Sequence, residues 1–136
     1  MTPEKLVELA IQARENAYCP YSCWAVGAAL LTKGGKVYLG CNIENGGFTA
    51  TNCAERTAFF KAVSEGEREF AAIAVVGGKE GDPDGTAFPC GVCRQVMMEF
   101  CNPETFKIYM AADLENFDEA TLAELLPRGF GAANLA

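Results

Sequence analysis

Cys53-Ala54-Glu55 and Pro89-Cys90-Gly91-Val92-Cys93 are the two segments that this chain must bring together, because they supply three thiols and one nearby carboxylate. Zinc prefers four ligands, and a site with three protein ligands leaves the fourth position for water. A carboxylate two residues from one ligand is placed to carry protons to and from that water. The two segments therefore predict a zinc site with Cys53, Cys90 and Cys93 as ligands and Glu55 as the proton carrier.

The cysteine spacing also permits other kinds of site. Cys90 and Cys93, at positions i and i+3, share one face of a helical turn, so Cys53 must come from a different helix. An isolated Cys-x-x-Cys is equally typical of a redox dithiol or of half a structural zinc site. A fourth protein ligand would best come from Cys41, because Cys101 lies about two turns further along the same predicted helix. Iron or cobalt could also occupy a thiolate site.

Two arginines directly follow the motifs, Arg56 after Glu55 and Arg94 after Cys93. Three thiolates give the zinc site a net negative charge, which an arginine donating to sulfur would offset. We assign this role to Arg56, whereas a solvent-facing position is the main alternative for Arg94. Because helix N-termini carry free N–H groups and partial positive charge, we also expect them to donate hydrogen bonds to the sulfurs.

Length and composition restrict the class of protein. The 136 residues predict one domain over 1–136, large enough for an ordinary core, and seven cysteines without a signal-like N-terminus predict a cytoplasmic protein. No apolar run approaches the roughly 20 residues that cross a bilayer, so we expect no membrane association. The net charge of −7 argues against a nucleic-acid partner. Histidine is absent, which leaves acid–base chemistry to groups such as Glu55.

The hydrophobic pattern alternates between helices and strands. Pro3 to Tyr18 is predicted as an amphipathic helix with Thr2 as its N-cap. Lys33-Gly34-Gly35 predicts a hairpin turn. The other expected elements are strands over 26–32, 37–41, 70–76 and 106–111, helices over 53–64, 90–101 and 121–126, and a loop over 77–87. This order predicts an α/β fold, a three-layer α/β/α sandwich with a mixed sheet, in which both cysteine motifs sit where loops enter helices.

With these motifs in place, the chain resembles the cytidine deaminase family, specifically its small-subunit, three-cysteine type. Ligand-x-Glu followed by Pro-Cys-x-x-Cys is a described signature of zinc deaminases. The resemblance covers nearly the whole length through ordered blocks: Pro20-Tyr21-Ser22, Val26-Gly27-Ala28-Ala29, Gly40-Cys41-Asn42-Ile43-Glu44-Asn45, Cys53-Ala54-Glu55-Arg56, Pro89-Cys90-Gly91-Val92-Cys93-Arg94-Gln95 and Leu125-Leu126-Pro127.

The resemblance implies a five-stranded mixed sheet, one Zn²⁺ per subunit, and a homotetramer with shared active sites. It implies hydrolytic deamination of cytidine and 2′-deoxycytidine to uridine and 2′-deoxyuridine, with release of ammonia, in pyrimidine salvage. Asn42 and Glu44 match the pair that holds the ribose 3′-hydroxyl, and Ala54 matches a substrate contact. Phe130 matches an aromatic residue that enters a neighbour's site, although by sequence it could equally cap its own core.

The chain departs from the family pattern at three places. Trp24 stands where Phe is usual, Phe48 where Tyr is common, and Gly46-Gly47 replaces a bulkier pair. We place Trp24 in the substrate pocket, with the core as the alternative. Phe48 could lie either in the pocket for the base or in the core. We expect Gly46-Gly47 to loosen the loop at the subunit junction, and the departures together to affect the range of substrates.

Three other functions remain to be distinguished. A deaminase acting on an aminopyrimidine antibiotic such as blasticidin S would share the cysteine motifs but would not need Asn42 and Glu44. A nucleic-acid editing deaminase is disfavoured by the acidic balance and the absence of histidine. A zinc-binding module without enzymatic activity would show four protein ligands and no open coordination position.

Overall fold

The computed structural model describes residues 1–80 and 86–136, so the middle of the predicted 77–87 loop lies outside the described residues. The elements, in chain order, are α1 (Pro3–Arg14), β1 (Trp24–Thr32), β2 (Val37–Cys41), the 3₁₀ helix η1 (Phe48–Ala50), α2 (Ala54–Ser64), β3 (Phe70–Lys79), α3 (Gly91–Phe100), β4 (Lys107–Ala111), β5 (Phe117–Thr121), α4 (Leu122–Leu125) and the 3₁₀ helix η2 (Ala132–Leu135).

The five strands form one mixed sheet in the order β2-β1-β3-β4-β5. β1 pairs with β2 and with β3 in antiparallel register, β3 pairs with β4 in parallel, and β5 runs antiparallel to β4. The central strand β3 is almost wholly buried, as expected for a continuous apolar run covered on both faces. The parallel β3–β4 pair requires a crossover, which α3 provides.

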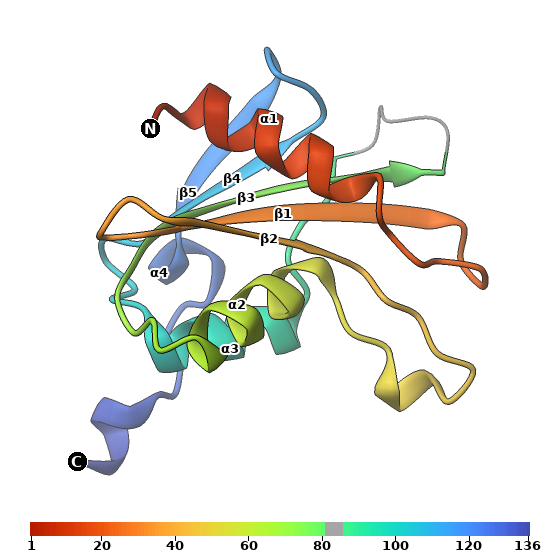
Figure 1. The fold of residues 1–136 in the computed structure, drawn as a ribbon. Helices are drawn as coiled ribbons and strands as arrows, with labels where there is room; N and C mark the ends of the chain where they lie inside the picture. Colours follow the sequence, from red (N-terminus) through yellow and green to blue (C-terminus); the bar gives the residue numbers. More distant parts are fainter. Residues whose placement is uncertain (81–85) are drawn as a thin grey trace.

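Helices cover both faces of the sheet, as the α/β/α prediction requires. Figure 1 shows α1 on one face and α2 beside α3 on the other. Two separate buried clusters correspond to these layers, one centred on Phe59, Met97 and Ile108 beneath α2 and α3, the other on Leu6 and Val7 of α1. The fold therefore confirms the three-layer architecture and the mixed five-stranded sheet.

The first helix and the hairpin form for local reasons that the sequence contains. The Thr2 hydroxyl accepts a hydrogen bond from the Lys5 amide at 3.1 Å, which confirms Thr2 as the N-cap of α1. At the turn between β1 and β2, Gly35 has a φ of 96°, where glycine carries no steric penalty. Helix α1 ends at Arg14, earlier than the predicted Tyr18, because Tyr18 leaves the helix and pairs with Ile43.

Glycines let the two helical layers approach the sheet closely. On one face, a Cβ on Gly27 of β1 would lie 2.8 Å from Arg14 Cα in α1. On the other face, a Cβ on Gly40 of β2 would meet the Ala54 carbonyl oxygen and lie 2.6 Å from the Ala58 amide nitrogen in α2. These clashes are with backbone atoms, so only a shift of the helix could relieve them.

Gly40→Ala is therefore expected to lower the free energy of unfolding by at least about 2 kcal/mol, the scale of overpacking in a close-packed interior. Urea denaturation followed by circular dichroism measures this change. Gly34→Ala is the matched control, because a Cβ there would lie 3.8 Å from its nearest neighbour, the Thr32 hydroxyl. Equal losses in the two variants would contradict the close packing of α2 on β2.

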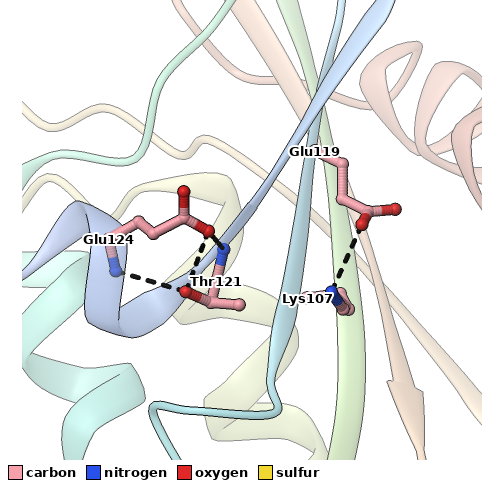
Figure 2. Close-up of polar contacts among 4 residues, drawn as sticks. All are labelled: Lys107, Glu119, Thr121 and Glu124. Carbon is pink, nitrogen blue, oxygen red and sulfur yellow. Dashed lines mark hydrogen bonds and ion pairs between the residues drawn. The ribbon is translucent and has the colours of Figure 1, made fainter.

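The far edge of the sheet contains the strand that the sequence pattern missed. β5 has the sequence Phe-Asp-Glu-Ala-Thr and buries only one residue fully, so it lacks a strong strand signal. Figure 2 shows an ion pair between Lys107 of β4 and Glu119 of β5, whose Nζ and Oε2 atoms are 3.3 Å apart. It also shows the capping box, in which the Glu124 carboxylate accepts from the Thr121 amide. These contacts tie the edge strand to the sheet and begin α4, which is shorter than the predicted 121–126 helix.

β3 also differs from its predicted extent. The strand continues to Lys79, three residues beyond the predicted end, because Gly77, Gly78 and Lys79 pair with Val26, Ala25 and Trp24 of β1. Across the described ranges, no helix combines the length and apolar character needed to cross a bilayer.

Candidate functional site

Cys53, Cys90 and Cys93 meet where α2 and α3 begin on the same face of the sheet. Their sulfur atoms all lie within 4.8 Å of one another. The Cys53 and Cys90 sulfurs are 3.8 Å apart, and the Cys90 and Cys93 sulfurs are 3.5 Å apart. Tetrahedral Zn–S bonds of about 2.3 Å place two ligand sulfurs roughly 3.8 Å apart, so the spacing and the soft donor set fit a zinc ion.

The remaining cysteines do not join this cluster. Cys41 ends β2, and Cys101 is buried at the C-cap of α3, the end opposite Cys90. Within the described ranges, the group of residues that could hold a metal contains only the three motif cysteines. Burial raises the pKa of Cys41, and it raises that of Cys101 further, which favours the neutral thiol at both positions. The cluster thus offers three protein ligands.

Arg56 makes the contact to sulfur that the sequence assigned to it. Its Nη2 donates to the Cys53 sulfur at 3.2 Å. Neither Cys53 nor Cys90 accepts a side-chain capping hydrogen bond at its own helix N-terminus, so that part of the sequence interpretation was wrong. Both residues occupy the N-cap position in extended conformation, from which their side chains face the cluster rather than the helix.

Electrostatics at the cluster favour thiolate at Cys53. A hydrogen bond from the Cys93 thiol, together with the Arg56 guanidinium, lowers the pKa of Cys53, while the proton is retained on Cys93, whose pKa is raised. Within the described residues, Arg56 Nε is a buried donor without a partner. A half-buried guanidinium that interacts with the Cys53 and Cys93 sulfurs fits a site that accumulates negative charge.

Arg94 has a different role from Arg56. Its Nε donates to the Pro89 carbonyl at 2.7 Å and its Nη1 to the Leu125 carbonyl at 2.6 Å. Both contacts are to backbone oxygen, so Arg94 ties the segment before α3 to α4. It neither contacts sulfur nor simply faces solvent.

Glu55 is buried in the first turn of α2, directly after the N-cap Cys53 and Ala54. Only 4% of its surface is exposed, and this burial raises its pKa to about 7. The nearby Cys53 thiolate raises the pKa further, and Arg56 opposes it. A carboxyl group with this pKa can both accept and donate a proton near neutrality, as a general acid–base group must.

A cavity of about 430 Å³ opens in front of the cluster and Glu55. Its walls bring together most of the residues that the sequence singled out, from segments far apart in the chain. It is lined by Ser22, Trp24, Val26, Asn42, Glu44, Thr51, Asn52, Cys53, Ala54, Glu55, Thr86, Ala87, Phe88 and Cys90. Its size and mixed lining suit a small organic molecule.

Asn42 and Glu44 lie on the same wall, and each is held by backbone groups. Asn42 accepts from the Val26 amide at 2.9 Å and donates from Nδ2 to the Trp24 carbonyl at 2.7 Å. Glu44 accepts from the amides of Tyr21 at 2.9 Å and of Ser22 at 3.1 Å. These bonds fix both side chains before any ligand binds.

The aromatic residues divide between the cavity and the outer surface. Trp24 lines the cavity, as predicted, with 44% of its surface exposed. Phe48 lies in neither the core nor the cavity, since it is 77% exposed and its ring meets Tyr21 edge-on. Phe130 is 58% exposed and outside the cavity lining, which excludes the prediction that it caps its own core.

The sequence interpretation assigned no site role to several wall residues, namely Ser22, Thr51, Asn52, Thr86, Ala87 and Phe88. Phe88 directly precedes the Pro89-Cys90 motif, so adjacency to that motif was the available signal. Ala87 packs against Gly77 near the end of β3, so closely that a Cβ on Gly77 would lie 2.6 Å from the Ala87 methyl group. The others come from loops, where periodicity carries no information.

Comparison with known proteins agrees with this geometry. The family profile described as "Cytidine and deoxycytidylate deaminase zinc-binding region" matches residues 1–110. A cytidine deaminase of Sporosarcina psychrophila is 51% identical to this chain, over all of this chain and 96% of the relative. A cytidine deaminase of Halalkalibacterium halodurans is also 51% identical, over 99% of this chain and 98% of the relative. The crystal structure of cytidine deaminase from Burkholderia pseudomallei has a TM-score of 0.86 at 47% identity, covering 96% of this chain and 100% of that chain.

The match extends well past the metal motifs and includes the segments that build the cavity walls. A profile spanning residues 1–110 covers the segments that contribute Trp24, Asn42 and Glu44 as well as the cysteine cluster. With its fold, its cluster of three cysteines and these relatives, the chain belongs to the cytidine and deoxycytidylate deaminase family of zinc hydrolases.

Proposed function

We propose that this protein hydrolyses cytidine and 2′-deoxycytidine to uridine and 2′-deoxyuridine, with release of ammonia, in pyrimidine salvage. The observation that carries the proposal is the buried Glu55 carboxyl, adjacent to the three-cysteine cluster and facing the cavity that also contains Asn42 and Glu44. The proposed acid–base group, two of the three cluster cysteines and the proposed sugar-binding side chains thus line one cavity.

One zinc ion per chain would be held by Cys53, Cys90 and Cys93. When bound, zinc supplies a Lewis acid that lowers the pKa of a water molecule in its open position. Arg56, which donates to Cys53, would offset the negative charge of the thiolates.

Glu55 would carry the protons of the reaction. It accepts a proton from the attacking water as oxygen bonds to C4 of the base, and it delivers a proton to N3 as electron density arrives there. It then assists departure of the amino group as ammonia, so one carboxyl serves as base and then as acid. Its burial also keeps bulk water from competing for these protons.

Asn42 and Glu44 would bind the sugar. One N–H of Asn42 Nδ2 is used by the Trp24 carbonyl, which leaves the second N–H as a donor. Glu44 supplies an acceptor on the same wall. One donor and one acceptor are what a single hydroxyl group requires. Ala54 and Trp24, which line the same cavity as Glu55, would contact the base.

A free nucleoside suits this cavity better than a nucleotide. No lysine or arginine occurs in the lining drawn from the described residues, so no cation there would pair with a 5′-phosphate. The Glu44 carboxylate would also repel a phosphate group placed near the sugar.

Incubation of the purified protein with cytidine tests the proposed function. We expect loss of the cytidine absorbance band and one ammonia released per uridine formed, with kcat/KM for dCMP lower than for cytidine. Turnover of blasticidin S in preference to cytidine would contradict the proposal, as would dCMP turned over more efficiently than cytidine. Metal analysis of the same preparation determines whether zinc is present.

We also propose that the 136 residues act as one catalytic domain in a cytoplasmic homotetramer with shared active sites. Phe130 supports the assembly, because this exposed aromatic lies outside the cavity of its own chain and the C-terminal segment extends away from the sheet (Figure 1). The free thiols of all seven cysteines agree with a reducing compartment.

Analytical ultracentrifugation should give a mass of about four times the 14.5 kDa of one chain. Phe130→Ala is expected to raise KM by about tenfold through loss of an aromatic contact made in trans. Leu135→Ala, another exposed apolar residue of the tail, is the control. A monomer with full activity would contradict the shared site.

A further inference from the structure

Ser22 joins the Glu44 carboxylate to the start of β1. Its hydroxyl donates to Oε2 of Glu44, and its backbone amide donates to Oε1 at 3.1 Å. The same hydroxyl oxygen accepts from the Trp24 amide at 3.0 Å. Ser22 therefore contacts both oxygens of Glu44 and lines the cavity with it.

These contacts use most of the hydrogen-bonding capacity of Glu44. An ionised carboxylate has about four acceptor positions, two on each oxygen. Oε1 accepts from the amides of Tyr21 and Ser22, so both of its positions are used. Among the described residues, only the Ser22 hydroxyl donates to Oε2, which leaves one acceptor position on that oxygen for a ligand.

The direction of the Ser22 hydroxyl is also fixed. A serine hydroxyl has a single proton, and the Trp24 amide donates to its oxygen, so its proton is free to point at Glu44. The Ser22 hydroxyl, followed by the amides of Ser22 and Tyr21, holds the pKa of Glu44 below its usual range. Glu44 thus remains an ionised acceptor whose last position has a defined direction.

We propose that Ser22 is a positioning residue for substrate specificity: by orienting Glu44, it sets the affinity for the sugar hydroxyl. The inference rests on the proposed function, because it assigns to Ser22 a share in nucleoside recognition. Ser22 acts through Glu44 and takes no part in proton transfer at the base.

The segment that contains Ser22 is anchored without its hydroxyl. The Cys23 carbonyl accepts from the Glu80 amide at 2.7 Å, and the Cys19 thiol donates to the Glu80 carboxylate at 3.1 Å. On the other side, the Tyr18 amide donates to the Asn42 carbonyl at 2.9 Å. Ser22→Ala is therefore expected to fold. It removes the contact to Glu44 and also frees the Trp24 amide, and the Glu44→Gln background below separates the two effects.

The test compares Ser22→Ala, Ser22→Thr and the matched control Ser64→Ala. The Ser64 hydroxyl donates to the Lys61 carbonyl at the far end of α2. With cytidine, Ser22→Ala should raise KM about tenfold with kcat within about twofold, the effect of losing one charge-assisted hydrogen bond. With 3′-deoxycytidine, which lacks the hydroxyl that Glu44 would accept, its kcat/KM should equal that of the unaltered protein. Ser22→Thr should restore discrimination between the two nucleosides.

A double-mutant cycle with Glu44→Gln separates action through Glu44 from direct contact. On the Glu44→Gln background, Ser22→Ala should change KM by less than about twofold. The affinity for uridine, measured by fluorescence of the single tryptophan Trp24, should likewise fall in Ser22→Ala alone and stay unchanged when Ser22→Ala is added to Glu44→Gln. Equal effects on both backgrounds, or unchanged discrimination in Ser22→Ala, would overturn the positioning role and leave the proposed function intact. Absence of cytidine turnover by the unaltered protein would overturn both.

Discussion

Glu55→Gln is expected to lower kcat for cytidine by at least about 10²- to 10⁴-fold while the protein keeps its zinc. Glutamine has nearly the same shape as protonated glutamate, and Glu55 is buried in the first turn of α2, so the substitution changes protonation chemistry with little change in packing. The amide cannot take a proton from water or deliver one to N3 of the base. The metal ligands are left in place.

The measurement pairs steady-state deamination with zinc analysis of the same protein. Glu65→Gln is the control, because Glu65 is an exposed carboxylate at the other end of the same helix, where activity should remain unchanged. If Glu55→Gln retained near-normal turnover, another group would have to move the protons, and the assignment of Glu55 would be wrong. Loss of zinc in Glu55→Gln would instead make the residue part of the metal site.

Cys90→Ser should weaken zinc binding by at least about 100-fold and abolish detectable deamination. A serine hydroxyl stays protonated at neutral pH and is a poor replacement for thiolate, so only two of the three protein ligands remain. Cys90 is exposed at the N-cap of α3, outside both core clusters, so the loss should come from the metal rather than from unfolding. Zinc titration of the chelator-treated protein measures the affinity.

Cys41→Ser provides the matched control. Cys41 was the best sequence candidate for a fourth protein ligand, but it lies outside the sulfur cluster, so its variant should bind zinc normally and remain active. Release of zinc by Cys41→Ser would mean that four cysteines fill the coordination positions. The proposed hydrolysis would then have no position for water.

Local patterns predicted the elements that depend on nearby residues. Thr2 caps α1, and Gly35, with a φ of 96°, forms the turn between β1 and β2, since these signals act within a few residues. β5 was missed because its acidic residues lack strand character, and only pairing with β4 makes it a strand. Helix α1 was predicted too long because the pairing of Tyr18 with Ile43 is a contact between distant segments.

The candidate site also combines features that the sequence predicted with features that only the fold revealed. The motifs identified the three cysteines and Glu55, and the sequence assigned the contact to sulfur to Arg56, but it did not predict that Arg94 donates to carbonyl oxygens. The two arginines occupy similar places in sequence. Their different roles arise from the groups that folding places opposite each guanidinium.

By itself, the sequence determined which chemical groups are available and which lie within one helical turn, because i, i+3 spacing fixes the proximity of Cys90 to Cys93. Tertiary structure alone decided that Cys53 comes within 3.8 Å of Cys90, and that Glu44 faces the Ser22 hydroxyl. The physical reason is that both contacts join segments separated along the chain. The first contact follows from packing α2 and α3 side by side on one sheet, and the second from antiparallel pairing of β1 with β2, which brings the start of β1 next to the end of β2. No local periodicity records either arrangement.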